Sequence, residues 1–136
     1  MLKSFKDPAG THGYKFDIEG DNTPYVEMVL SPGKKILAEA GTFMAKQPDV
    51  KMTMALGDGK QTNILSKAFG AAKRKISGDN ALFSHFENVA KDDSEQLLVL
   101  TAPHPGQIIA IDLAAAGGSV ICQKGAFMAA PSGTSE

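Results

Sequence analysis

The feature that most constrains this chain is an internal repeat, in which a Pro-Gly pair and a later glycine each precede a short apolar stretch. In the first copy, Pro32-Gly33 leads to Gly41-Thr42-Phe43-Met44-Ala45. In the second copy, Pro105-Gly106 leads to Gly125-Ala126-Phe127-Met128-Ala129. Such a repeat predicts a duplicated β-structure. It indicates how a core is built, and neither copy contains a recognisable catalytic motif.

Alternation of apolar and polar residues predicts an all-β fold. Tyr14, Phe16 and Ile18 alternate with charged residues, which is the period-two pattern of a strand with one solvent-exposed face. Turn residues separate further stretches of this kind, at a spacing typical of sandwiches and barrels, so we expect a β-sandwich of repeated β units. The predicted strands are Gly13–Glu19, Tyr25–Leu30, Lys35–Ala40, Thr42–Ala45, Val50–Leu56, Leu82–Val89, Gln96–Ala102, Gln107–Leu113, Ser119–Gln123 and Ala126–Ala130.

One segment departs from the strand pattern. Between residues 61 and 75, apolar residues recur at spacings of three and four, which predicts a short helix, although Gly70 weakens the pattern and leaves a helical loop as the alternative. We expect this helical insertion near residues 67–76. The whole is predicted to form one domain over residues 1–130, followed by a disordered tail at 131–136.

Charge and composition narrow the class of protein. The chain has 136 residues, with 14 basic and 15 acidic side chains, so no long-range field draws it to nucleic acid or to an anionic membrane. The N-terminus lacks the apolar core of a secretory signal, and no stretch has the length of a membrane span. The single cysteine, Cys122, lies in an apolar run and is predicted to be a small buried hydrophobe. We therefore expect a cytoplasmic protein.

Several motifs, in a shared order, resemble those of one known family. Ser31-Pro32-Gly33 followed by Ala38-Glu39-Ala40-Gly41 resembles a proline-glycine-glutamate segment and an alanine-glutamate-x-glycine segment, with Lys34 where the family often has an acid. Residues 69–83 resemble a glycine-rich stretch with a glycine-acid-x-x-leucine-phenylalanine element, in which Asp79 replaces the more usual glutamate. Over most of Tyr14 to Ala130, the chain is similar to the altered inheritance of mitochondria protein twenty-four family.

This resemblance carries expectations about fold and assembly. It implies a β-sandwich similar to the tryptophan RNA-binding attenuator protein, with a tendency to form closed homo-oligomers. It implies no established enzyme activity and no cofactor, and the bacterial members are largely uncharacterised. Typical members run past the end of this chain, so we expect either a short member or the first portion of a longer protein. Symmetric pairing in a closed ring would protect the edge strands, and a trimer is the first state that we expect.

The histidines and two acidic residues are the candidate chemical groups. His12, His85 and His104 belong to no paired metal-binding motif, so no metal is expected, and His85 is predicted to be a partly buried strand residue. Glu39 and Asp112 each fall in a predicted apolar strand beside a repeat motif, where a buried acid either accepts structural hydrogen bonds or acts as a general base. No nucleophile is suitably spaced, which favours the structural interpretation.

Lys73, Arg74 and Lys75 form the only basic cluster and are the tentative binding site. Three such charges are more often a solvated face, and the near-neutral charge and absence of tryptophan argue against RNA binding. Gly57-Asp58-Gly59 and Gly117-Gly118 are typical of hairpin turns. The methionines are expected in the core, with an exposed subset as a possible contact surface: Met28, Met44, Met52, Met54 and Met128.

Taken together, these patterns predict a non-enzymatic homo-oligomer that acts as a scaffold or binding module, with a protein partner possible and a membrane association left open. The first alternative is a protein that binds RNA or a small ligand in grooves between subunits. The second is an unrecognised hydrolase that uses Glu39 or Asp112.

Overall fold

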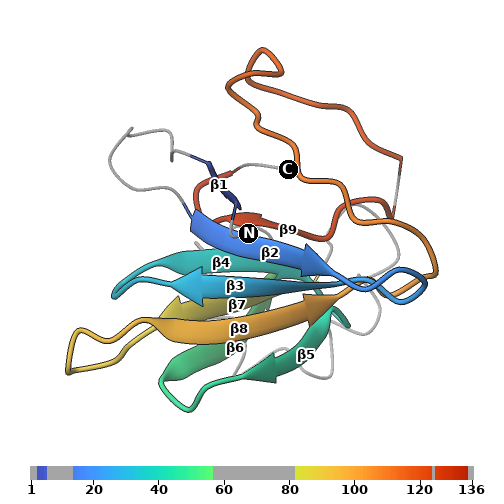
Figure 1. The fold of residues 1–136 in the computed structure, drawn as a ribbon. Coiled ribbons are helices and arrows are strands. Elements are labelled where there is room, and N and C mark those ends of the chain that lie inside the picture. Colours follow the sequence, from blue (N-terminus) through green and yellow to red (C-terminus); the bar gives the residue numbers. More distant parts are fainter. Residues whose placement is uncertain (1–2, 6–13, 57–81, 124, 135–136) are drawn as a thin grey trace, which may run out of the picture.

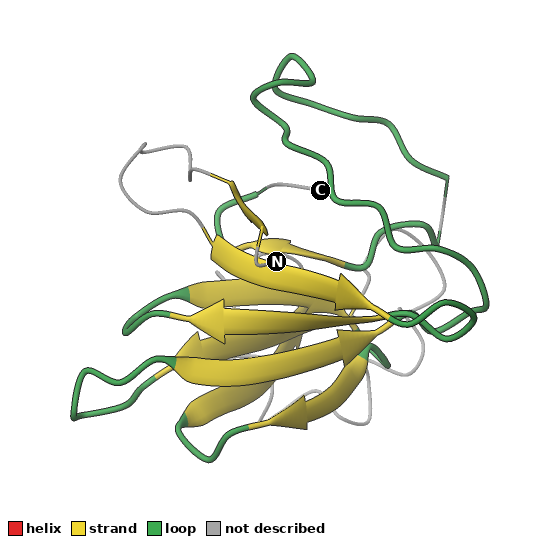
Figure 2. Cartoon of the chain, viewed as in Figure 1, coloured by secondary structure: helices red, strands yellow, loops and turns green. Residues whose placement is uncertain are grey.

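The computed structural model describes residues 3–5, 14–56, 82–123 and 125–134. These residues form nine β-strands and no helix (Figures 1 and 2). The strands are β1 Lys3–Phe5, β2 Tyr14–Glu19, β3 Tyr25–Leu30, β4 Lys35–Glu39, β5 Phe43–Lys46, β6 Val50–Leu56, β7 Leu82–Asn88, β8 Gln96–Thr101 and β9 Ala129–Pro131. No helix long and apolar enough to cross a membrane occurs within this part of the chain.

The strands form two antiparallel sheets. The five-stranded sheet has the order β1-β2-β3-β8-β5, and the four-stranded sheet has the order β6-β7-β4-β9. The predicted strands from residue 13 to 56, and those at 82–89 and 96–102, are confirmed to within a residue or two at their ends. The all-β prediction is therefore confirmed for the residues that the structure describes.

The hydrophobic core lies between the two sheets. In the five-stranded sheet, Val26 lies opposite Leu100 and Met28 lies opposite Leu98, so their side chains share one face. In the four-stranded sheet, Ile36 lies opposite Phe86. The buried residues that pack together come from both sheets: Leu30, Ile36, Ala38, Val50, Phe86, Leu98 and Leu100. Alternation within each strand thus supplies the two facing apolar surfaces.

Asn88, at the end of β7, joins the two sheets through its side chain, which is 2% exposed. Its Nδ2 atom donates to the carbonyl oxygen of Leu30, in the other sheet, and to that of Ser94, both at 2.8 Å. Its Oδ1 atom accepts a hydrogen bond of 2.9 Å from the amide of Ala90. Both polar atoms of the Asn88 side chain therefore have hydrogen-bond partners, as is usual for a buried amide.

A corner at residues 40–42 carries the chain from one sheet to the other. Thr42 is fully buried, and its Oγ1 atom donates to the carbonyl oxygen of Glu39 at 2.8 Å. The carbonyl oxygen of Thr42 accepts from the amide of Thr101 at 2.8 Å. These bonds place β5 beside β8, at the end of the five-stranded sheet.

Two predicted strands, residues 107–113 and 119–123, are absent. Both segments lie in the loop of residues 102–128 that connects β8 to β9, and none of the loop residues that the structure describes is in a strand (Figure 2). The prediction is wrong because apolar sequence alone does not make a strand, and these segments pair with no strand among the described residues. The second copy of the repeat therefore contributes β9 alone, and a strand-for-strand duplication is not seen.

The ends of the predicted domain also differ from expectation. β9 runs to Pro131, and the amide of Ser132 donates to the carbonyl oxygen of Lys35 at 2.9 Å. The expected boundary at residue 130 thus falls inside β9, and residues 131 and 132 of the expected tail bond to β4, while residues 135 and 136 lie outside the described residues. The predicted helical insertion near 67–76 lies outside the described residues.

Candidate functional site

The structure places some of the predicted site residues. Lys73, Arg74 and Lys75, the tentative binding cluster, lie outside the described residues, as does His12. His85 lies in β7 and is partly buried, which confirms that expectation. His104 lies in the loop after β8 and is exposed. Within the described ranges, no three His, Cys, Asp or Glu side chains gather in a group that could hold a metal ion.

Glu39 and His85 lie on the face of the four-stranded sheet that points away from the core. His85 is opposite Leu37, and Glu39 is two residues further along β4, on the same face. The Oε2 atom of Glu39 and the Nε2 atom of His85 are buried and have no hydrogen-bond partner in the described part of the chain. Nearby, Phe83 packs edge-on against Phe127, with ring centroids 6.0 Å apart. A carboxylate and an imidazole therefore share an apolar face without bonding to each other.

Asp112 has a different setting from the one predicted. It lies in the loop between β8 and β9, and its Oδ1 atom accepts hydrogen bonds from the amides of Ala114 and Ala115, at 3.0 and 3.3 Å. The expectation of an acid within a strand is wrong. It accepts backbone hydrogen bonds, as the structural alternative expected, but it is not buried. Asp112 closes a turn in this loop, where Gly117 and Gly118 have positive φ, at 85° and 95°, although the strands of the predicted hairpin are absent.

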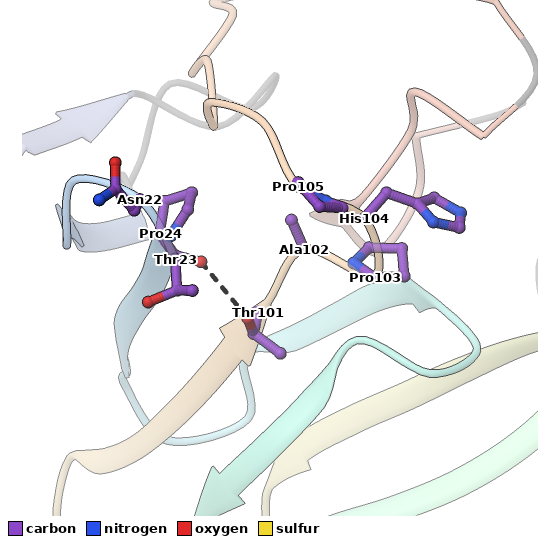
Figure 3. A pocket seen from close by; sticks show the side chains of 8 residues that line it. All are labelled: Asn22, Thr23, Pro24, Thr101, Ala102, Pro103, His104 and Pro105. Carbon is purple, nitrogen blue, oxygen red and sulfur yellow. Dashed lines mark hydrogen bonds between the residues drawn. The ribbon is translucent and has the colours of Figure 1, made fainter.

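One shallow pocket lies between the β2–β3 turn and the segment after β8 (Figure 3). It encloses about 240 Å³ and is lined by eight residues: Asn22, Thr23, Pro24, Thr101, Ala102, Pro103, His104 and Pro105. The hydroxyl of Thr101 donates to the carbonyl oxygen of Pro24 at 3.3 Å, which ties its two walls together. The His104 ring points away from the pocket (Figure 3). Since ligand sites usually enclose roughly 300–1,000 Å³, this pocket is small for one.

The most extensive candidate site is an exposed apolar surface. Large exposed hydrophobic residues in the described chain are Phe43, Met44, Met54, Val89, Ile109, Ile111, Val120 and Ile121. Most of them fall in two places, the edge strand β5 and the loop between β8 and β9. We call Ile109, Ile111, Val120 and Ile121 the loop surface. Ile109 is 77% exposed and Ile121 is 101% exposed, which is unusual for isoleucine.

Sequence reasoning missed the loop surface because it assigned both of its segments to strands. For the same reason the predicted burial of Cys122 is wrong, since this thiol is exposed. The methionines divide as the two expectations allowed. Met28, Met52 and Met128 pack against the core, whereas Met44 and Met54 are exposed.

Comparison with known proteins assigns the family. The sequence profile described as mitochondrial biogenesis AIM24 matches residues 16–135, nearly the whole chain. The chain belongs to the AIM24 family. This assignment confirms the resemblance drawn from the order of the short motifs between Ser31 and Phe83. A search of curated proteins found no match to this AIM24-family chain.

Proposed function

We propose that this AIM24-family chain is a non-enzymatic β-sandwich, similar to the tryptophan RNA-binding attenuator protein, that assembles with copies of itself and acts as a scaffold or binding module. The observation that carries the proposal is the loop surface, together with exposed Phe43 and Met44 on β5. Single exposed apolar residues are ordinary. Several gathered on one loop and one sheet edge are typical of a protein contact.

The position of β5 supports self-assembly in particular. It is the last strand of the five-stranded sheet, and all four of its residues are exposed. An exposed apolar edge invites uncontrolled pairing, and a closed oligomer covers such edges by symmetry. We propose a trimer. The family's description as a mitochondrial biogenesis family supports a scaffold that works near a membrane.

Light scattering tests the assembly directly. The native mass is measured at two protein concentrations and at low and high salt, and we expect about three times the 14.3 kDa of one chain. An apolar contact persists at high salt, because salt screens charges and does not weaken apolar burial. A mass of one chain under all conditions contradicts the proposal.

A variant pair locates the contact. Ile109→Asp combined with Ile111→Asp places two charges on the loop surface, and we expect the mass to fall to that of one chain while the circular dichroism spectrum stays unchanged. Val89→Asp is the matched control, since Val89 is 44% exposed but lies in neither β5 nor the β8–β9 loop. Equal loss of assembly in both variants would mean that the loop surface is not the contact.

RNA binding is the second candidate, favoured by the basic cluster Lys73, Arg74 and Lys75. It predicts a salt-sensitive mobility shift with mixed RNA, because phosphate contacts release counterions. That shift should disappear when the three residues are changed to alanine. A shift that survives these changes excludes this cluster as the binding site.

A further inference from the structure

The two copies of the internal repeat already pair with each other once. β4 contains the apolar stretch of the first copy, and β9 follows the glycine motif of the second copy. Leu37 lies opposite Ala130, and the amide of Glu39 donates to the carbonyl oxygen of Met128 at 2.9 Å. The first stretch of one copy is therefore paired with the second stretch of the other.

The repeat defines a reciprocal pairing that the chain does not make. Alignment of the two Pro-Gly pairs places Ala110 at the position of Leu37, and alignment of the two glycine motifs places Lys46 at the position of Ala130. The reciprocal pair is then Ala110 opposite Lys46. In the same register Asp112, the counterpart of Glu39, is level with Met44, at the β-bulge where β5 shifts register against β8 between Phe43 and Ala45. Residues 109–112 would thus lie along β5 as β9 lies along β4.

Both segments, β5 and residues 109–112, are accessible for this pairing. The amide of Gln47 donates to the carbonyl oxygen of Leu97, so the alternation of an antiparallel strand directs the N–H and C=O groups of Lys46 to the free edge of β5. These are the groups that the reciprocal register requires. No hydrogen bond between described residues involves the backbone of 107–111. Ile109, Ile111 and Met44 are 77%, 47% and 57% exposed.

The two members lie on opposite sides of the molecule. In Figure 1 the β8–β9 loop, which carries 109–112, projects from the top of the molecule, whereas β5 lies at the bottom, at the end of the five-stranded sheet. We propose that residues 109–112 of one copy add to β5 of a second copy as an antiparallel strand, with Ala110 opposite Lys46. This inference rests on the proposed assembly and supplies its contact. A donor and an acceptor on different sides form a head-to-tail interface, which closes into a ring when the rotation allows.

Disulfide cross-linking tests the register. Cys122 is first changed to serine, and two proteins are prepared in that background, one with Ala110→Cys and one with Lys46→Cys. A hydrogen-bonded antiparallel pair has its Cα atoms about 5.5 Å apart, within the range that a disulfide spans. After mild oxidation of the equimolar mixture, we expect a covalent dimer that contains one chain of each kind, and at least several-fold less dimer from either protein alone.

Control positions separate the register from chance collision. Ala114→Cys replaces Ala110→Cys on the donor, in the turn that follows the proposed strand, and Lys51→Cys replaces Lys46→Cys on the acceptor. Equal yields from these mixtures contradict the pairing. An intramolecular disulfide in the double variant at high dilution also overturns it, because the segment then pairs with β5 of its own chain. An oligomeric mass without the specific cross-link overturns this contact alone, whereas a monomeric mass overturns the proposed function as well.

Discussion

Replacement of Asn88 by alanine should lower the free energy of unfolding by about 3 kcal/mol. The change removes three hydrogen bonds, to the carbonyl oxygens of Leu30 and Ser94 and from the amide of Ala90. Each such bond contributes about 1 kcal/mol net, and the bond to Leu30 is fully buried, so its carbonyl oxygen cannot recover the loss from water. Because Leu30 belongs to the other sheet, the change also removes a link between the two layers.

Urea unfolding followed by circular dichroism measures this effect, at one fixed protein concentration so that any assembly contributes equally. Asn22→Ala is the matched control, because Asn22 is an exposed asparagine in a turn. Its effect should stay below about 0.5 kcal/mol. A loss of less than about 1 kcal/mol for Asn88→Ala would refute the reasoning, since it would mean that the three bonds are replaced by water or do not form.

Three further substitutions test the core, a turn and a surface carboxylate. Phe86→Ala removes a fully buried ring that stacks on Phe43, with ring centroids 5.8 Å apart. It should lower the free energy of unfolding by about 3–5 kcal/mol in the same urea assay. A change near zero would contradict the place of Phe86 in the core. Gly20→Ala should lower Tm more than Gly33→Ala. Both glycines have positive φ, at 85° and 75°, but only at Gly20 would the new Cβ lie 2.7 Å from a backbone oxygen, and equal shifts in Tm would contradict this difference. Hydrogen bonds from the Ser94 side chain and amide lower the pKa of Asp92 in the folded protein. The Asp92 carboxylate therefore stabilises the fold above its unfolded pKa of about 4, and this stabilisation is lost as the pH falls through the lower folded pKa. Asp92→Asn should therefore lose less stability than the unmodified protein when urea unfolding is compared at about pH 5 and about pH 2, and identical losses would contradict the assignment.

Local patterns in the sequence were sufficient to locate most strands. Tyr25–Leu30 was predicted with the bounds that the structure shows, and the alternation of Tyr14, Phe16 and Ile18 marks β2. Alternation is a property of a single strand, because successive side chains point to opposite faces whatever the neighbour. The family could also be recognised from the order of short motifs, for which no structure was needed.

The candidate contact could not be predicted in this way. Residues 107–113 and 119–123 have the composition of strands, and their exposure depends on whether another strand lies beside them. That depends on the paths of β4, β5 and β9, which are far apart in the sequence. The exposed thiol of Cys122 follows from the same cause.

The sequence by itself determined where the chain extends, where it turns, and which family it belongs to. Only the tertiary structure decided that β8 lies between β3 and β5, that β4 pairs with β9, and that Asn88 is buried between the sheets. Residues that are near one another in the sequence decide whether a segment favours the extended conformation. The strand with which it pairs depends on contacts between segments that are distant in the sequence. A strand without a partner leaves its backbone N–H and C=O groups unpaired.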